Sequence, residues 1–350
     1  MTAAEPCDLP AAEARRLIGR KALSPVELLE SCLRRVEAVN PAVNAVVALD
    51  ANRARAAARE AEAAVMRGDH LQPLHGLPVG IKDLEETAGL RTTYGSPIFR
   101  DFVPDADCGM VDRIRAAGGI VLGKTNTPEF GAGANTRNAV YGATGNPFDP
   151  ARSAAGSSGG SAVALATGMA PLCSGSDTGG SLRNPAAFCG VVGFRPSSGL
   201  VTSEKRGLGW SCLPVLGPMA RSVPDTALLL SAMASDDAYD PLAYTLHARP
   251  VRGEKALFHP VRQIDLSTLS LAFSEDFGMA PVEETVRAAF RGVAAAASKL
   301  FRASGEAHPD CTDGDTAFEV LRAGNFLHSH GEKVRTRPQD VGPNVRANVE

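Results

Sequence analysis

Hydrophobic residues recur at helical spacing through residues 10–67 of the chain. Three helices are predicted, over residues 10–20, 24–40 and 50–67. Ser24 and Glu27 form the pattern of a capping box at the start of the second helix, and Asn40-Pro41 is expected to end it. This helical opening, residues 1–69, is predicted to pack against the rest of the chain and to carry no chemistry.

Short apolar runs alternate with helical patterns in the middle of the chain. Strands are predicted at 79–81, 119–123, 170–173 and 191–194, and helices over 107–117, over 162–166 and from 224 onward. After a polar segment at 236–262, we expect a strand at 269–273 and a helix that Pro281 opens and that ends near Gly305. This alternation is typical of an α/β protein.

The composition is that of a globular protein. The chain has 350 residues, 44% of them hydrophobic and 21% charged, which is enough for a large core. A net charge of −3 without a long basic run predicts no nucleic-acid or membrane surface, and the N-terminus lacks the apolar centre of a signal peptide. Seven cysteines are scattered without CxxC spacing, and three of them stand among apolar residues and are expected to be reduced core thiols, namely Cys173, Cys189 and Cys212. The predicted compartment is therefore the cytoplasm.

Two Gly/Ser clusters stand out, GSSGGS at 156–161 and GSDTGGS at 175–181. The helix and strand predicted between them would bring both clusters to one end of a sheet. Glycine lets backbone N–H groups approach a ligand, and such donors beside a serine hydroxyl suit acyl transfer, in which the attacked carbonyl oxygen gains negative charge. Two flexible linkers are the alternative, but linkers seldom alternate with apolar helix and strand patterns.

Lys82 follows the strand predicted at 79–81 directly. A lysine there is usually an exposed strand end, and from the residues alone we favour that interpretation. The alternative is a lysine held among apolar walls, where burial disfavours the ammonium form and lowers the pKa.

Other catalytic patterns are rejected on their context. Residues 118–125 match the phosphate-binding pattern GxxxxGK[ST], but their middle is strand-like and no sustained helix follows. Residues 156–160 match the GxSxG of α/β-hydrolases, but a turn precedes them where a strand is needed. The histidines available for a triad stand in no distinctive setting; they are His247, His259, His308, His328 and His330. We interpret His328 and His330 as parts of a solvated loop and expect no metal site.

The lysine segment and the Gly/Ser clusters together resemble the amidase signature family. The motifs are GLPVGIKD at 76–83, GSSGGS at 156–161 and GSDTGGSLR at 175–183, continued by PAAFCGVVG at 185–193. The resemblance covers about residues 70–235. It implies an α/β fold with a mixed β-sheet sandwiched between α-helices, and hydrolysis of a carboxylic amide without metal or cofactor.

The resemblance also implies a role for each matching residue. Ser181 would be the nucleophile that forms the acyl-enzyme, Ser157 would pass a proton, and Lys82, neutral at rest, would be the general base. A cis peptide bond would precede Ser157. The oxyanion hole would be formed by the N–H groups of Thr178, Gly179, Gly180 and Ser181.

Nearby polar residues receive structural interpretations. Ser158 and Ser161 are expected to cap or support the helix at 162–166, and Asp177 is expected to bond nearby backbone N–H groups in a turn. Two interpretations of Arg183 stay open, contact with substrate or bracing of the loop.

The chain departs from the family at two places. Ala154-Ala155 stands where members usually carry Pro-Gly, which we expect to tighten the loop before Ser157. Members usually continue beyond the position of Glu350, so we expect a C-terminally incomplete domain that lacks part of the acyl-side pocket.

We expect a single amidase domain over 1–350, with a helical part at 1–69, a core with the catalytic loops at 70–235 and a variable part at 236–350. Its predicted partner is a small-molecule amide, with a homodimer as one open outcome. Two alternatives remain, the glutaminase-like A subunit of a tRNA-dependent amidotransferase and a non-catalytic fragment of an amidase.

Overall fold

The computed structural model describes residues 5–204, 206–244 and 258–350. Two compact units can be distinguished: a first unit, Met1–Val261 with Gly324–Glu350, and a second unit, Arg262–Ala323. His247 and part of the polar segment at 236–262, which is predicted to be a surface excursion, lie outside the described residues.

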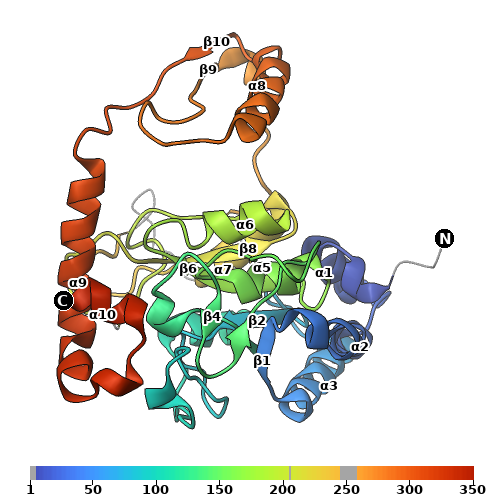
Figure 1. Cartoon of the computed structure of the whole chain (residues 1–350). Coiled ribbons are helices and arrows are strands. Elements are labelled where there is room, and N and C mark those ends of the chain that lie inside the picture. Colours follow the sequence, from blue (N-terminus) through green and yellow to red (C-terminus); the bar gives the residue numbers. More distant parts are fainter. Residues whose placement is uncertain (1–4, 205, 245–257) are drawn as a thin grey trace. The chain divides into compact units, whose positions relative to one another are not determined.

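Three helices open the first unit, α1 (Ala11–Gly19), α2 (Pro25–Val43) and α3 (Ala51–Arg67) (Figure 1). The capping box at the start of α2 is confirmed, since Ser24 Oγ accepts from the Val26 amide at 2.9 Å and the Ser24 amide donates to Glu27 Oε2 at 3.0 Å. The predicted end at Asn40-Pro41 is wrong. A proline in the last turn removes only one backbone donor, and the helix continues to Asn44, which adopts the left-handed conformation.

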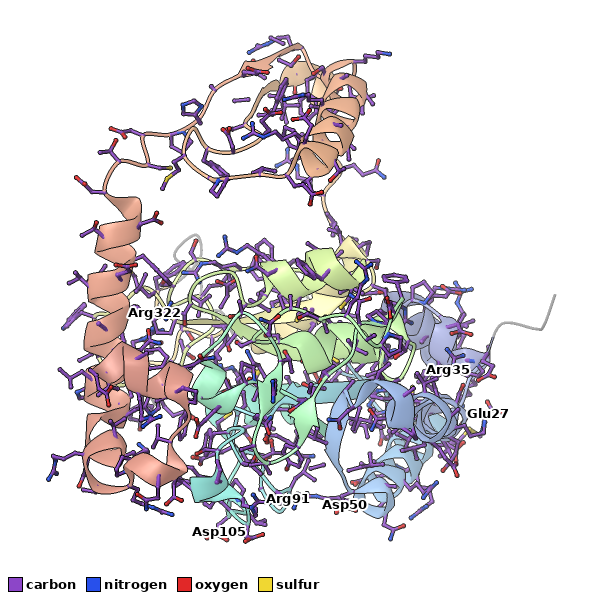
Figure 2. The ribbon with its side chains drawn as sticks, in the orientation of Figure 1. Glu27, Arg35, Asp50, Arg91, Asp105 and Arg322 are labelled. Atoms are coloured by element: carbon purple, nitrogen blue, oxygen red, sulfur yellow. The ribbon has the colours of Figure 1, made fainter. Side chains whose placement is uncertain are left out.

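The charged side chains of these helices lie at the outside of the unit, as Glu27, Arg35 and Asp50 show (Figure 2). Asp50 caps α3 by accepting from the Arg53 amide at 3.0 Å. This part of the chain therefore supplies a packing layer with a charged exterior.

A six-stranded sheet forms the centre of the first unit. Its strand order is β1-β3-β2-β6-β8-β7. The strands are β1 (Val46–Leu49), β2 (Pro78–Lys82), β3 (Ile120–Thr125), β6 (Leu172–Asp177), β7 (Val192–Gly193) and β8 (Val215–Ala220). β2 pairs in parallel with β3 and β6, whereas the other pairs are antiparallel. The predicted mixed sheet is confirmed.

Two apolar clusters cover the two faces of this sheet. Neighbouring residues of β6 face opposite ways, so Leu172 belongs to one cluster and Cys173 to the other. The first cluster includes α1, α4 (Gly109–Ala116) and α7 (Val223–Met233), and the second includes α3 and α5 (Gly159–Ala166). The sheet is thus sandwiched between helices, as the resemblance implied.

Two predicted elements of the first unit differ in the structure. The strand expected at 191–194 shortens to the half-buried β7, because α6 (Arg183–Cys189) ends just before it at Gly190. His328 and His330 lie in α9 (Gly314–Thr336), so the predicted solvated loop is wrong. The ring of His330 stacks on Phe130 with the centroids 4.4 Å apart, so this side chain is packed against the chain and not solvated.

The second unit contains a parallel pair of strands, β9 (Ser270–Phe273) and β10 (Ala303–Glu306), and α8 (Glu284–Ser298). The strand predicted at 269–273 is confirmed. The helix predicted from Pro281 begins three residues later, and its predicted end near Gly305 is wrong, because the helix ends at Ser298 and the chain then forms β10. The remaining elements are the hairpin of β4 (Arg137–Asn138) and β5 (Gly142–Ala143), and α10 (Pro343–Val349). Among the described residues, no helix is long and apolar enough to cross a membrane.

Candidate active site

The three motifs meet at one edge of the central sheet. Lys82 is the last residue of β2, and the loop that carries Ser181 follows β6. Because β2 and β6 are parallel neighbours, their carboxyl ends lie at the same edge. Ser157 comes from the loop before α5, a helix that packs against both strands.

Lys82 is fully buried, with no exposed surface. Its Nζ lies 2.7 Å from Ser157 Oγ, 2.9 Å from Ser158 Oγ and 2.9 Å from Ser176 Oγ. The interpretation of Lys82 as an exposed strand end is therefore wrong, because the side chain turns inward onto hydroxyl groups.

Burial lowers the pKa of Lys82 to about 7, and the negative charges of Glu85 and Asp177 oppose part of this effect. An amine with that pKa is largely neutral at slightly alkaline pH. It therefore retains a lone pair that can accept a proton.

The peptide bond between Gly156 and Ser157 is cis, as the resemblance implied. The Ser157 side chain is buried, and its hydroxyl contacts the amine of Lys82. Ala155 adopts a positive φ of 55°, and its carbonyl accepts from the Thr136 amide at 3.1 Å. The Ala154-Ala155 pair is thus compatible with the turn that presents Ser157.

Ser181 is half-buried at the start of α6, and its carbonyl accepts from the Ser158 amide at 3.2 Å. In the part of the chain that the structure describes, the Ser181 hydroxyl forms no hydrogen bond, so it is available to a ligand. The amides of Thr178, Gly179 and Ser181 likewise donate to no acceptor of the described chain, whereas the Gly180 amide donates to Asp177 Oδ1 at 2.8 Å.

Asp177 organises the loop between β6 and α6. Its carboxylate also accepts from the Leu182 amide at 3.1 Å, from Arg183 Nε at 3.0 Å and from Arg195 Nη1 at 3.0 Å. Burial alone would raise the pKa of Asp177, but the Arg183 and backbone hydrogen bonds together lower it to about 2. The interpretation of Asp177 as a turn residue is confirmed, and Arg183 braces this loop.

Two further serines contact the amine of Lys82, and no motif had predicted these contacts. Ser158 was expected to cap or support α5; its side chain forms no cap hydrogen bond and contacts Lys82 instead. The contact of Ser176 follows from the two-residue period of a strand, which places Ser174 and Ser176 on the same face of β6. Ser174 Oγ accepts from the main-chain N–H of Lys82, and Ser176 Oγ contacts Lys82 Nζ. Ser161 supports the site from α5 by donating to the Ser174 carbonyl at 2.8 Å.

The rejection of the two other catalytic patterns is confirmed. Residues 120–125 of the phosphate-loop match form β3, and Lys124 is buried there with its Nζ 3.0 Å from Thr87 Oγ1. No strand precedes residues 156–160. Among the residues that the structure describes, no group of three or more His, Cys, Asp or Glu side chains is arranged to hold a metal ion.

A pocket of about 260 Å³ in the first unit adjoins the lysine segment. Its lining includes Leu84, Glu85, Tyr94 and Glu204. Leu84, one of its lining residues, lies near the serine loop, since a Cβ at Gly131 would lie 3.1 Å from Leu84 Cδ1 and 3.7 Å from Ser157 Oγ.

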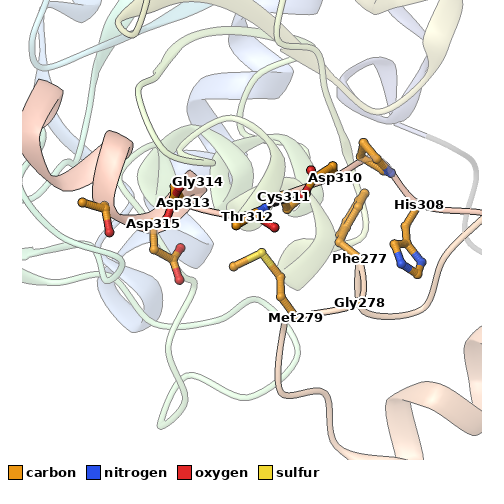
Figure 3. Close-up of a pocket in the computed structure, with 12 residues that line it drawn as sticks. Phe277, Gly278, Met279, His308, Asp310, Cys311, Thr312, Asp313, Gly314 and Asp315 are labelled. Carbon is orange, nitrogen blue, oxygen red and sulfur yellow. Dashed lines mark hydrogen bonds between the residues drawn. The ribbon is translucent and has the colours of Figure 1, made fainter.

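A second pocket belongs to the second unit alone, between residues 277–279 and 308–316 (Figure 3). Its polar side chains, among them His308, Asp310 and Asp315, are exposed to solvent. No residue of the three motifs lines it, so we assign it no part in amide chemistry.

The buried lysine and the two serine loops thus meet at one edge of a mixed sheet, the arrangement that the resemblance implied. The family profile described as Amidase matches residues 27–309. The chain belongs to the amidase signature family.

Three similar proteins illustrate this membership. The A subunit of the glutamyl-tRNA(Gln) amidotransferase of Anaeromyxobacter sp. (strain K) is 43% identical over 249 residues, 71% of this chain and 50% of that protein. The acylamidase of Rhodococcus erythropolis is 38% identical over 304 residues, 86% of this chain and 62% of that protein. The structure of a bacterial aryl acylamidase of the amidase signature family superposes with a TM-score of 0.84 at 27% identity, covering 98% of this chain and 70% of that one. The chain spans about half the length of the first of these relatives.

Proposed function

We propose that this protein hydrolyses a carboxylic amide to an acid and ammonia or an amine through an acyl-enzyme on Ser181. The observation that carries the proposal is the contact of 2.7 Å between the buried Lys82 Nζ and Ser157 Oγ. A largely neutral amine beside a hydroxyl is a general base with a ready proton path.

In the proposed reaction Ser181 Oγ attacks the amide carbonyl carbon. Its proton passes to Ser157, and the Ser157 proton passes to Lys82. The C–N bond then breaks, and the proton returns from Lys82 through Ser157 to the leaving nitrogen. Water hydrolyses the ester on Ser181 by the same relay, which releases the acid and restores the serine.

The developing oxyanion needs N–H donors beside Ser181. We assign this role to the unpaired amides of Thr178, Gly179 and Ser181. Gly180 belongs to the same loop, and its amide instead holds the Asp177 carboxylate that shapes the turn. The pocket that begins at Leu84 is the proposed site for one side of a small-molecule amide.

The test is labelling with a fluorophosphonate probe, which phosphonylates an activated serine. We expect one adduct on Ser181, none in Ser181→Ala, and labelling slower by at least about a hundredfold in Lys82→Ala. Cys212, which was predicted to be a core residue, is exposed, so Cys212→Ala changes a surface thiol and serves as the control. An adduct on another serine, or unchanged labelling in Lys82→Ala, would contradict the proposal, and an unlabelled folded chain would favour the non-catalytic fragment.

The similarity to the A subunit of a glutamyl-tRNA(Gln) amidotransferase supports a second candidate, a glutaminase-like protein that works with partner subunits. Glutamine hydrolysis that rises on addition of such partners, together with their copurification, would favour it over a free-standing amidase. The cytoplasm is the proposed compartment of either, because all seven cysteines are free thiols.

A further inference from the structure

Three hydroxyl groups surround the amine of Lys82, and the proposed relay uses only that of Ser157. Ser158 Oγ and Ser176 Oγ lie as close as a hydrogen bond requires, each 2.9 Å from Nζ. The two come from different segments, the loop before α5 and the end of β6. The amine of Lys82 is therefore contacted by Ser158 and Ser176 in addition to Ser157.

The role of the Ser158 hydroxyl is fixed by its other contacts. It donates to the Ser176 carbonyl at 3.3 Å and accepts from the Ser176 amide at 3.3 Å. Because its single proton is directed to that carbonyl, Ser158 can only accept from Lys82. Ser176 Oγ has no other hydrogen bond in the described part of the chain, and it too can accept an N–H of Lys82.

A neutral primary amine has two N–H donors and one lone pair. If Ser158 and Ser176 take the two donors, the tetrahedral nitrogen directs its lone pair at the remaining neighbour, the hydroxyl of Ser157 at 2.7 Å. That is the direction in which the proton has to move. Without one of the two acceptors, the amine can rotate about its last carbon–nitrogen bond, and the lone pair no longer has a fixed direction.

We propose that Ser176 is a positioning residue, which together with Ser158 holds the neutral amine of Lys82 so that its lone pair faces Ser157. This inference rests on the proposed function, since it concerns the base of that reaction. Ser176 is not one of the three residues that would exchange protons, which are Lys82, Ser157 and Ser181.

The charged surroundings of the amine come from several elements. Glu85 follows β2, Asp177 ends β6, and both attract a proton to Lys82. Lys124 on β3 interacts with Glu85 and not directly with Lys82. Residues 153–166, the end of the loop before α5 and α5 itself, carry no ionisable side chain, and Asp149 and Arg152 earlier in that loop pair with each other. Replacing Ser176 changes none of these charges, so a shift in the titration of Lys82 would report the lost hydrogen bond.

The experiment measures the rate of fluorophosphonate labelling of the full chain against pH. In Ser176→Ala the plateau rate is expected to fall about tenfold, because the base loses its fixed direction. The midpoint of the acid limb is expected to move down by about half a pH unit. The ammonium form loses an acceptor of a charge-assisted hydrogen bond, which costs it more than the neutral form.

Two comparisons separate positioning from general damage. Ser176→Thr keeps the hydroxyl and is expected to restore both values, whereas Ser176→Val has the same shape without the hydroxyl and is expected to behave like Ser176→Ala. This pair decides the question even where the alanine variant does not fold. Ser174→Ala removes a hydroxyl of the same strand that accepts only from the main-chain N–H of Lys82, at 3.0 Å, and is expected to leave the midpoint unchanged.

The inference is overturned by a wild-type midpoint and plateau in Ser176→Ala, by equal behaviour of the Thr and Val variants, or by an equal shift in Ser174→Ala. Each of these results requires a wild-type chain that is labelled on Ser181. A wild-type chain that is not labelled at any pH refutes the proposed function instead, and the inference with it, so the two failures are distinct.

Discussion

At the scale of the residue, the charge state of Lys82 follows from its surroundings. Full burial penalises the ammonium form, and the nearest polar groups are uncharged hydroxyls. Glu85 and Asp177 restore part of the preference for the proton, and together these effects leave a pKa of about 7. A lysine with its ordinary pKa of about 10.4 would be protonated at neutral pH and could not act as a base.

The pH dependence of the reaction should report this ionisation. Only the neutral amine can accept a proton, so kcat/KM is expected to rise along an acid limb with a midpoint near pH 7. A pH series with a slow amide substrate, whose chemical step limits the rate, measures it. A profile that is flat from pH 5 to about 9 would show that Lys82 is not the base.

The same shift has a consequence for stability. Between its folded pKa of about 7 and its unfolded pKa, Lys82 binds a proton in the unfolded chain and not in the folded one, so stability rises with pH in that window. Relative to Lys82→Met, the wild-type chain should gain about 1.4 kcal/mol in the free energy of unfolding per pH unit between pH 7 and about 10. Urea unfolding of both proteins at pH 7 and pH 9 measures the gain. If the free energies of unfolding of the two proteins differ by the same amount at pH 7 and at pH 9, Lys82 keeps an ordinary pKa in the folded chain.

At the scale of the element, the close approach of α5 to the sheet holds the serine loop in place. A Cβ at Gly160, in the first turn of α5, would lie 2.2 Å from the Asn126 amide nitrogen just beyond β3. Only glycine allows the helix to lie so near the backbone. The position of Ser157 and Ser158 next to Lys82 depends on that contact.

Gly160→Ala is accordingly expected to destabilise the first unit by about 2 kcal/mol or more and to slow labelling of Ser181, because α5 has to move outward. Gly292→Ala in α8 is the matched control, since nothing lies within 4 Å of its Cβ position and alanine favours a helix. Thermal unfolding and labelling rates of both variants measure the effects. Equal stability of the two variants would contradict the argument.

Local patterns were sufficient to predict many elements. The capping box of α2, the helix α3 and the strands β2 and β3 are encoded in adjacent residues, and they were predicted at nearly their observed positions. The half-buried β7 was predicted too long, because its apolar residues reflect packing beneath α6. His330 was misjudged for a similar reason, since its burial depends on Phe130, two hundred residues earlier.

The site residues that belong to the three motifs could be predicted from the sequence. Lys82, Ser157 and Ser181 came from the resemblance, whereas the residues alone favoured an exposed Lys82. Burial of Lys82 and its contact with Ser176 are tertiary facts. They depend on the register that pairs Gly80 of β2 with Cys173 of β6, which no local pattern specifies.

At the scale of the whole molecule, the two units differ in how much apolar surface they bury. The first unit contains the sheet and both of its apolar clusters. In the second unit, all of which is described, Ala294 is the only buried hydrophobic residue, while Phe277, Val286 and Val293 are more than half exposed. Apolar burial is the main source of stability, so the second unit has little of its own.

Native-state hydrogen exchange should reveal this difference. The amides of β2, β3 and β6 are expected to exchange only on global unfolding of the first unit, because both faces of these strands are buried. The amides of α8 and of β9 are expected to exchange at least about a hundredfold faster, through local opening that costs a few kcal/mol less. Mass spectrometry of peptic peptides from the deuterated chain measures both sets in one experiment.

Because Lys82, Ser157 and Ser181 all belong to the first unit, fluorophosphonate labelling of Ser181 should persist under mild urea that already exposes the amides of α8. If the labelling of Ser181 and the exchange protection of α8 are lost at the same urea concentration, the two units unfold together. The reactivity of Ser181 would then depend on the folded state of residues 262–323.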